Sequence, residues 1–338
     1  MPTIRDVAKQ AGVAPITVSR VINHSASVSA GTRARVEQAI DELGYVPNRL
    51  ARSLRLKQTH TIALVVTDIT NPFWTTVVRG VEDAAQDAGF NVILCNTDES
   101  ETKQNQYLDV LLQKQVDGIV LVPARASVDV TEWIKKQTIP IVILDRRVGS
   151  APVDVVRGDS EDGAYQLVKH LISLGHRRIA VLSGPQEVST AVDRVSGYCH
   201  ALTEAGLDIR ADWVKYGRFD PASGYEMAQQ VLDASPRPTA LFAINNFIAV
   251  GALRALANAG LAVPRDMSVV TIDDLTAKLV IEPFLTVADQ PAYEMGWRAA
   301  KLLLSRLDGS APSGYQEIVL PVKMTVRGSS GRPRDLVK

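Results

Sequence analysis

The stretch TIRDVAKQAGVAPITVSRVIN, residues 3–23, contains two short helical patterns separated by a tight turn. Thr3 and Asp6 have the spacing of a capping box, and Gly12 is typical of a helix end. The second pattern starts at Pro15, a residue suited to a first helical turn. Apolar residues recur every three or four positions and predict one buried face on each helix. The predicted core residues of this helix-turn-helix are Ile4, Val7, Ala8, Ala11, Val18, Val21 and Ile22.

A third helix is predicted after Ser29, a good N-cap, and it should end at Gly44. If the second helix turns its apolar face to the core, its opposite face can enter a DNA major groove. There Arg20 can donate two hydrogen bonds to a guanine, and Ile16 can pack on a thymine methyl group. Short polar side chains nearby suit phosphate contacts, which position a protein without specifying a sequence. The predicted DNA contacts of these helices are Thr3, Pro15, Ile16, Thr17, Ser19, Arg20, Asn23, Ser29 and Thr32.

Charge is distributed unevenly along the chain. The 338 residues carry 37 Lys and Arg and 37 Asp and Glu, so the formal net charge is zero. Residues 1–60 hold nine basic and four acidic residues, which makes this end a candidate nucleic-acid surface. The segment PNRLARSLRLKQ, residues 47–58, places an arginine at every third position, but a helix of about a dozen residues is marginal alone. Its basic residues Arg49, Arg52 and Arg55 are therefore candidates for that surface.

From Thr61 onward, short apolar runs alternate with helical patterns. The runs TIALVVTD, FNVILCN, DGIVLVP and IPIVILD have the length and β-branched composition of strands. A second series consists of RRIAVLSG, WVKYG, TALFAIN and MSVVTID. Two successive sets of alternating strands and helices predict an α/β body of two lobes, each with a parallel sheet and helices on both faces.

The residues that follow the predicted strands are polar, acidic or aromatic. Ligands of parallel sheets bind beyond the carboxyl ends of the strands, so these residues are binding candidates. Asp145 and Asp274 are the strongest, because each ends an apolar strand. Aromatic faces flanked by carboxylates, an amide and an arginine suit a small polar ligand with a flat or ring-shaped body. The remaining candidates are Asp68, Asn71, Pro72, Phe73, Trp74, Arg146, Asp159, Arg194, Phe219, Asn245, Asn246 and Asp273.

The segments TIRDVAKQAGVAPITVSRVIN, VSAGTRARVEQAIDELGYVPN and LARSLR closely resemble the DNA-binding head of the lactose-repressor (LacI) family of transcription regulators. The resemblance implies that the second helix reads the major groove. It also implies that the NRLARSLR segment is a hinge helix, which orders on operator DNA and pairs with its dimer mate in the minor groove. The DNA contacts implied for this hinge are Asn48, Arg49, Arg52, Leu54 and Arg55, and Leu54 matches the leucine that wedges into a base step. Ala14 departs from the usual capping Ser or Thr, a loss of about 1 kcal/mol in typical hosts.

The resemblance extends through the body, which is similar to the family's effector domain and to periplasmic sugar-binding proteins. It implies a DNA-binding domain at 1–46, a hinge at 47–59 and a ligand-binding and dimerisation domain at 60–338. The implied lobes are approximately 60–160 plus 290–320, and 161–289 plus 321–338. Two departures, Asn245-Asn246 for Asn-Asp and Asp159-Ser160 for Asp-Asn, leave the identity of the ligand open. By position, the implied ligand contacts are Phe73, Trp74, Asp145, Asp159, Arg194, Phe219, Asn246 and Asp274.

Other functions lack their signatures. Motifs for dinucleotide, P-loop, zincin and hydrolase chemistry are absent, and the five histidines and two cysteines have no metal-binding spacing. We therefore expect no catalytic residues, no metal and no cofactor. The start of the chain has no secretory signal and no apolar run reaches the length of a membrane span, so a cytoplasmic protein without membrane contact is expected. A solute-binding protein of transport and an α/β enzyme are the alternatives. The preferred interpretation is a homodimeric repressor that binds double-stranded, pseudo-palindromic operator DNA and a carbohydrate-like effector.

Overall fold

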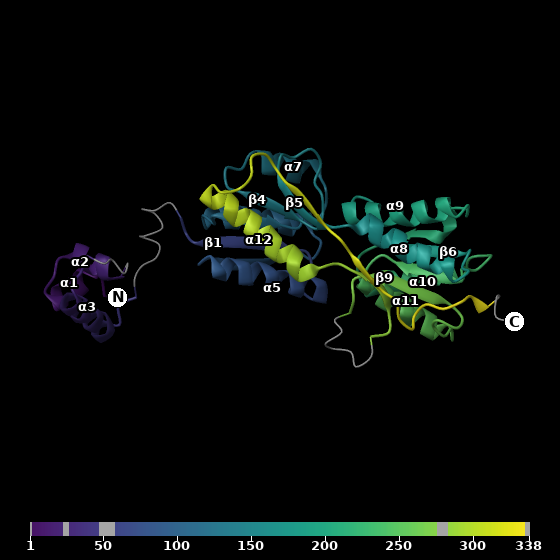
Figure 1. Ribbon diagram of the computed structural model, residues 1–338, viewed down its shortest axis with the longest axis horizontal. Helices are drawn as coiled ribbons and strands as arrows, with labels where there is room; N and C mark the ends of the chain where they lie inside the picture. Colours follow the sequence, from purple (N-terminus) through teal and green to yellow (C-terminus); the bar gives the residue numbers. More distant parts are fainter. Residues whose placement is uncertain (1, 23–26, 47–57, 276–282, 335–338) are drawn as a thin grey trace. The chain divides into compact units, whose positions relative to one another are not determined.

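A computed structural model describes residues 2–22, 27–46, 58–275 and 283–334. The chain divides into two compact units, Met1–Thr59 and His60–Lys338 (Figure 1). Asn23 and the predicted hinge contacts Asn48, Arg49, Arg52, Leu54 and Arg55 lie outside the described residues. The roles of these residues therefore stay predictions.

The first unit contains the three predicted helices. Thr3 and Asp6 form the predicted capping box of α1, Ser29 caps α3, and Gly12 and Gly44 end α1 and α3 in the left-handed conformation. The apolar faces of the helices meet in one small core, in which Val7, Val18 and Val36 are fully buried. The helix-turn-helix prediction is thus confirmed, with bounds α1 Ile4–Ala11, α2 Pro15–Ile22 and α3 Ala30–Leu43.

The first lobe of the second unit is built on a six-stranded sheet with the order β11-β5-β4-β3-β1-β2 in the described residues. All of its strand pairs are parallel. The strands are β1 Thr61–Val66, β2 Asn91–Asn96, β3 Gly118–Leu121, β4 Ile141–Leu144, β5 Asp154–Gly158 and β11 Glu317–Leu320. Its helices are α5 Pro72–Asp87, α6 Glu101–Gln113, α7 Val128–Lys135 and α12 Ala292–Asp308.

Strand β1 shows why this sheet needs helices on both faces. Ile62 and Leu64 belong to the core formed with α5 and α12, whereas Ala63 and Val65 belong to the core formed with α6 and α7. Successive side chains of a strand point to opposite faces, so an unbroken apolar run is buried on both sides. The run TIALVV therefore encodes the three-layer arrangement of helices, sheet and helices.

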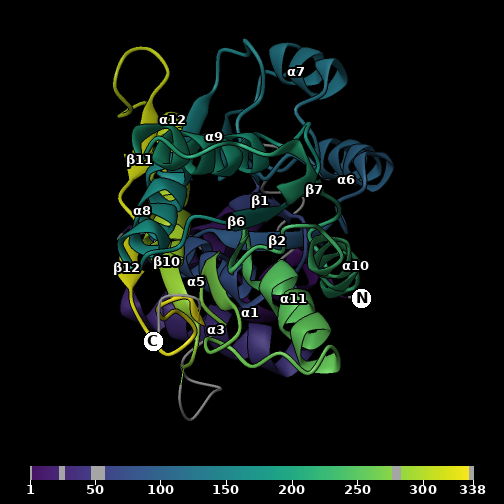
Figure 2. The ribbon, with the colours of Figure 1, turned by 90° about the vertical axis from the view of Figure 1, so that its right-hand side faces the viewer.

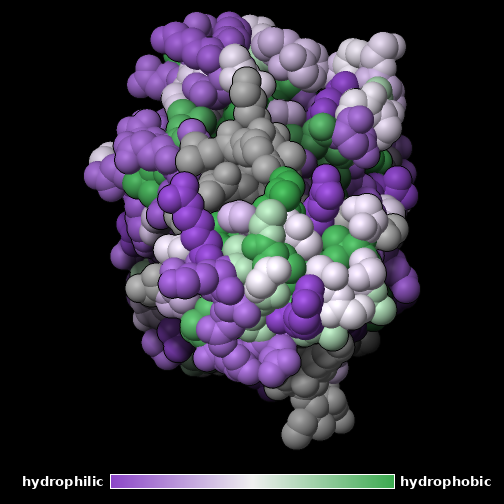
Figure 3. Space-filling model, turned by 90° about the vertical axis from the view of Figure 1, so that its left-hand side faces the viewer, coloured by the Kyte–Doolittle hydropathy of each residue, from purple (hydrophilic) through white to green (hydrophobic). Residues whose placement is uncertain are grey.

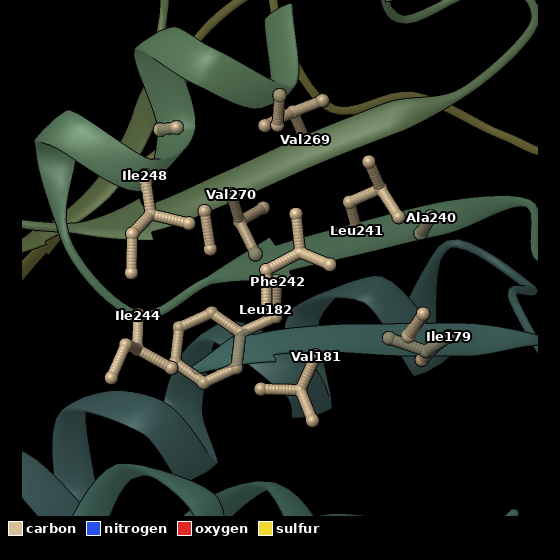
Figure 4. Packing of buried hydrophobic residues seen from close by; sticks show 14 of the residues in the cluster. Ile179, Val181, Leu182, Ala240, Leu241, Phe242, Ile244, Ile248, Val269 and Val270 are labelled. Atoms are coloured by element: carbon tan, nitrogen blue, oxygen red, sulfur yellow. The ribbon is translucent and has the colours of Figure 1, made fainter. Parts of the chain in front are cut away.

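The second lobe repeats the design with a sheet of order β12-β10-β9-β8-β6-β7. Helices α8 and α9 lie on one side of this sheet and α10 and α11 on the other (Figure 2). Its core contains Val181, Phe242 and Val270 from three neighbouring strands, and Ile248 from α11 (Figure 4). The strands are β6 Ile179–Ser183, β7 Val214–Tyr216, β8 Ala240–Ala243, β9 Ser268–Ile272, β10 Thr286–Asp289 and β12 Lys323–Thr325. The helices are α8 Ser160–Ser173, α9 Ser189–Glu204, α10 Pro221–Leu232 and α11 Asn246–Asn258, with a short 3-10 helix at Ala211–Trp213.

The chain crosses between the lobes after β5, after β10 and after β11. The crossovers return α12 and β11 to the first lobe, where α12 lies along α5 (Figure 1). Gly80 and Gly296 allow this close approach: an added Cβ would lie 2.1 Å from the Tyr293 carbonyl oxygen and 2.1 Å from the Val77 carbonyl oxygen, respectively. The two sheets correspond strand by strand, except that β11 runs parallel to β5 and β12 antiparallel to β10.

Candidate functional site

The second helix of the head presents the side chains predicted to read DNA. Ile16 is 55% exposed although it is a large apolar residue, and Pro15 and Arg20 are also exposed. Thr17 and Ser19 are partly buried on the same helix. The exposed Ile16 side chain contributes little buried apolar surface to the stability of the head. Together with the exposed Arg20 it suits apolar and hydrogen-bonding contacts with base edges.

The two helix-capping hydroxyls are held in place by the head itself. Thr3 Oγ1 donates to the Asp6 carboxylate at 2.7 Å, and this hydrogen bond lowers the pKa of Asp6. Ser29 Oγ accepts from the Thr32 backbone N–H at 3.4 Å and donates to Thr32 Oγ1 at 3.0 Å. Thr3, Ser29 and Thr32 therefore fix the starts of two helices, and their role as phosphate contacts stays a prediction.

A cavity of about 480 Å³ lies in the second unit, lined by residues of both lobes. Its walls are formed by the segments that follow the strands at their carboxyl ends, as expected for parallel sheets. The volume falls within the range of about 300 to 1,000 Å³ found for small-molecule sites. The first lobe contributes Asp68, Thr70, Asn71, Phe73, Trp74, Asp98, Glu99, Arg125, Asp145 and Arg146, and the second contributes Pro185, Thr190, Arg194, Arg218, Phe219, Asp220, Asn245 and Asp273.

Two buried carboxylates occupy corresponding places in the two lobes. Asp145 follows β4 and Asp273 follows β9, and both have left-handed backbones, with φ of 65° and 64°. Such φ values are uncommon for residues other than glycine and tend to occur at functional sites. Burial raises the pKa of Asp145, and burial raises the pKa of Asp273 to about 7. Gln290 Nε2 donates to both oxygens of Asp273, at 3.0 and 3.2 Å.

Arg194 is the cation that these two carboxylates share. Its positive charge opposes the rise in the pKa of each carboxyl. The arginine is itself buried, and the second lobe fixes its position: Nε donates to Ser160 Oγ at 3.3 Å and Nη1 to the Ile244 carbonyl at 2.8 Å. The site therefore contains one anchored guanidinium whose charge acts on two carboxyls, a set that can both donate to and accept from a polar ligand.

Arg146 has a different role, because Glu99 neutralises it. The two side chains form a bidentate pair with distances of 2.6 and 2.7 Å. Burial alone would lower the pKa of Arg146, but the pair with Glu99 raises it. The guanidinium carbon lies 5.3 Å from the ring centre of Phe219, so the pair also positions an aromatic wall from the other lobe.

Two aromatic residues of the first lobe also line the cavity. Asn71 caps α5, and the Phe73 and Trp74 rings at the start of that helix meet edge to face, with centroids 4.8 Å apart. Both side chains are buried, yet both line the cavity. Together with Phe219 they provide apolar surface for the faces of a ring-shaped ligand.

Five of the eight predicted ligand contacts line this cavity, namely Phe73, Trp74, Asp145, Arg194 and Phe219. The other three, Asp159, Asn246 and Asp274, do not line it; next to Asn246 and Asp274 an adjacent residue lines it instead, and next to Asp159 the adjacent Ser160 holds a cavity residue. Asp159 caps α8, while Ser160 binds Arg194. Asn246 pairs with Asn71, while Asn245 lines the cavity.

Asp274 pairs with Arg327 at 2.7 Å, and Asp273 lines the cavity in its place. The left-handed backbone at Asp273 explains the change, because it redirects the chain immediately after β9. Sequence reasoning also missed residues after β2, β3 and β7, although they follow strands in the same way. These missed residues are Asp98, Glu99, Arg125, Arg218 and Asp220.

Comparison with known families assigns both units. Residues 3–48 match the family of bacterial regulatory proteins, lacI family, and residues 59–318 match periplasmic binding proteins and sugar binding domain of LacI family. The chain belongs to the LacI family. It is a DNA-binding transcription regulator with a body that binds a small molecule, so the predicted family and fold class are confirmed.

Individual LacI-family members resemble the chain over nearly its full length. It is 38% identical to the HTH-type transcriptional repressor PurR of Photobacterium profundum, over 91% of this chain and 92% of that protein. It is 38% identical to the ribose operon repressor of Escherichia coli (strain K12), over 98% of this chain and all of that protein. The crystal structure of the lac repressor dimer bound to operator and the anti-inducer ONPF is 31% identical, with a TM-score of 0.84 and coverage of 98% of this chain and 99% of that chain.

Three further properties concern this LacI-family member outside the cavity. In the described ranges, no helix combines the length and apolar character that crossing a bilayer requires. The view in Figure 3 shows a surface on which hydrophilic and hydrophobic residues are interspersed. The same ranges contain no cluster of three or more His, Cys, Asp or Glu side chains suited to a metal ion.

Proposed function

We propose that the chain is a homodimeric repressor whose affinity for a pseudo-palindromic operator is controlled by a sugar-like ligand in the cavity between the lobes. The DNA-reading part of this proposal rests on the exposed face of α2, with Ile16 and Arg20. The lac repressor in the similar solved structure is a dimer bound to operator. Two heads related by a twofold axis would read two half-sites of inverted sequence.

The ligand chemistry follows from the polar groups of the cavity. Asp145, Asp273 and Arg194 would bind neighbouring hydroxyl groups, with the carboxylates accepting and the guanidinium donating. Phe73, Trp74 and Phe219 would pack on the apolar faces of the ring, and Asn245 would add an amide. A cyclic polyol such as a pentose or hexose matches this combination.

One observation carries the proposal. Oδ1 of Asp145 is fully buried and accepts no hydrogen bond from the described residues. An unsatisfied buried polar group costs about 1 to 3 kcal/mol, and more for a charged group. A hydroxyl donor that reaches this oxygen when a ligand binds would remove that cost, so Asp145 favours ligands with hydroxyl groups over apolar ones.

The regulator would return its ligand unchanged. Asp145 and Asp273 are both buried and share Arg194, an arrangement that suits hydrogen bonding to hydroxyls. The relatives identified by sequence are named as transcriptional repressors. Ligand binding would change the arrangement of the lobes and hence operator affinity, a coupling that is typically about 1 to 3 kcal/mol and reciprocal.

A two-stage experiment tests the proposal. A thermal-shift screen of pentoses, hexoses and nucleosides first identifies a ligand, and selection from random duplex DNA identifies the operator. Operator binding is then measured with and without the ligand, and the ligand is recovered and examined for chemical change. We expect a sugar to raise the melting temperature, to change operator affinity and to be recovered intact. Conversion of the ligand, or a ligand without effect on DNA binding, would contradict the proposal.

A further inference from the structure

The two lobes are joined at the edge of the cavity by a pair of asparagines. Asn71 of the first lobe and Asn246 of the second exchange two hydrogen bonds: Asn71 Nδ2 donates to Asn246 Oδ1 at 2.9 Å, and Asn246 Nδ2 donates to Asn71 Oδ1 at 3.0 Å. Both side chains are buried, with exposed fractions of 8% and 0%. Burial away from water makes such a contact sensitive to the loss of either partner.

The backbone of each lobe fixes the orientation of its own amide. Asn71 Oδ1 also accepts from the Phe73 N–H at 3.0 Å, so its Nδ2 must point to the other lobe. Asn246 Nδ2 also donates to the Asp274 carbonyl at 3.3 Å, so its Oδ1 is left to accept. Each lobe therefore presents one donor and one acceptor to the other lobe. Both interlobe hydrogen bonds form only when each of the two side chains is an amide.

The pair adjoins three of the segments that line the cavity. Asn71 is two residues before Phe73, Asn246 follows Asn245, and the Asp274 carbonyl follows Asp273. A charged contact joins the lobes elsewhere, where Arg147 forms a bidentate pair with Asp193 at 2.6 and 2.7 Å. The Arg147 side chain is 38% exposed, so water screens that contact more than it screens the asparagine pair.

We propose that Asn71 and Asn246 form an interlobe clasp that holds the cavity segments in their binding arrangement before a ligand arrives. In this proposal the two residues act by positioning the cavity segments, and Asn71 also lines the cavity while Asn246 does not. Closing the lobes in advance raises ligand affinity. If only the closed form binds, the apparent affinity equals the affinity of the closed form multiplied by the fraction of molecules that are closed. The effect on ligand rests on the proposed function, but the clasp itself can be tested without any ligand.

Aspartate substitutions separate the clasp from local helix stability. In Asn71→Asp the new carboxylate still caps α5, because Asp is as good an N-cap as Asn. In Asn246→Asp the carboxylate lies in the first turn of α11, where the helix dipole favours it. Each variant keeps its own helix start, but each loses an N–H donor and places two acceptor oxygens opposite one another across the lobes.

Amide hydrogen exchange of the full-length, ligand-free protein tests the clasp. For Asn71→Asp we expect exchange on the order of tenfold faster in residues 243–252, although the substitution is in the other lobe. For Asn246→Asp we expect the corresponding increase in residues 70–77. The double variant should exchange faster than either single variant, because it removes the remaining interlobe hydrogen bond and places two carboxylates opposite one another. Asn105→Asp, at an exposed position on α6, is the matched control and should leave both segments unchanged.

Exchange that changes only in the lobe that carries the substitution, or in neither lobe, would overturn the clasp. If Asn71→Asp does not fold, Asn71→Ser gives the same test, because Ser also caps a helix but is too short to reach across. D-Ribose serves as the probe for the ligand arm, in which calorimetry should show on the order of tenfold weaker binding in both single variants. Unchanged affinity in variants with faster cross-lobe exchange would refute the positioning role. If the wild type does not bind ribose, ribose is not the ligand of the proposed function. The hydrogen-exchange result still tests the clasp, because that measurement uses the ligand-free protein.

Discussion

Asp145 and Asp273 end corresponding strands of the two lobes in the same left-handed backbone conformation, and both carboxyls feel the charge of Arg194. In the closed arrangement of the lobes described here, the charge of Arg194 acts on carboxyls from both lobes. A ligand that supplies hydroxyl donors would stabilise this closed arrangement, which links ligand binding to the relative position of the lobes.

Asp273 predicts a pH dependence of stability. Burial raises its pKa from an ordinary 3.8 to about 7, and Arg194 and Gln290 offset part of this effect while Asp145 and Asp289 add to it. Between these pH values the folded state binds more protons than the unfolded state, so the free energy of unfolding falls as pH rises from about 4 to 7. We expect Asp273→Asn to remove part of this fall, which urea unfolding between pH 5 and 8 can measure. Parallel curves for the wild type and the variant would show that Asp273 ionises normally.

Arg20 predicts base recognition by the second helix of the head. Arg20→Ala should weaken operator binding by about 1 to 3 kcal/mol and relax the preference at one base pair. Fluorescence anisotropy with single-base operator variants measures both effects. Thr17→Ala is a comparison on the same helix, for which a smaller and sequence-independent loss is expected. An equal loss for Arg20→Ala on every sequence would instead make Arg20 a phosphate contact.

Leu54 predicts a bend in the operator. Although it lies outside the described residues, its match to the wedge leucine of the family predicts that it unstacks a base step in the minor groove. Leu54→Ala should reduce the bend angle, measured by circular-permutation gel shift with the selected operator. Leu50→Ala is the control from the same segment. A wild-type bend angle in the Leu54 variant would count against the wedge.

The close approach of α5 and α12 at Gly296 predicts that the free energy of unfolding depends on this contact. A methyl group there would lie 2.1 Å from the Val77 carbonyl oxygen, so Gly296→Ala must separate the helices. We expect a loss of about 1 to 3 kcal/mol in the free energy of unfolding, measured in urea. Gly149→Ala is the control, because its methyl group would meet only Thr131 Oγ1 at 3.7 Å. Equal stability of the two variants would show that the helices can adjust without cost.

Local patterns in the sequence predicted the framework well. The capping box of Thr3 and Asp6, the cap at Ser29 and the apolar faces of the head depend on residues a few positions apart, and all occur in the structure. The strands were visible because runs such as TIALVV are buried on both faces. Periodicity and capping are properties of neighbouring residues, so they can be evaluated without knowledge of the tertiary structure.

The cavity could be predicted only in part. The ends of strands identified the correct segments, but the choice between adjacent residues depends on backbone angles and on partners far away in the sequence. Asp274 is held by Arg327 and Asn246 by Asn71, and neither partner is local. The pair of Asn71 and Asn246 spans 175 positions, and no periodic pattern in the chain predicts it.

Control of operator binding by a ligand in the interlobe cavity can be measured as the operator affinity of the full-length protein. This affinity is determined with and without the ligand found by screening, in the wild type and in Arg194→Ala. We expect a change of at least about fivefold in the wild type and none in Arg194→Ala, whose affinity for operator without ligand should be normal. Arg157→Ala, which removes a pair with Glu317 outside the cavity, should respond like the wild type. An equal ligand response in Arg194→Ala and the wild type would contradict the account.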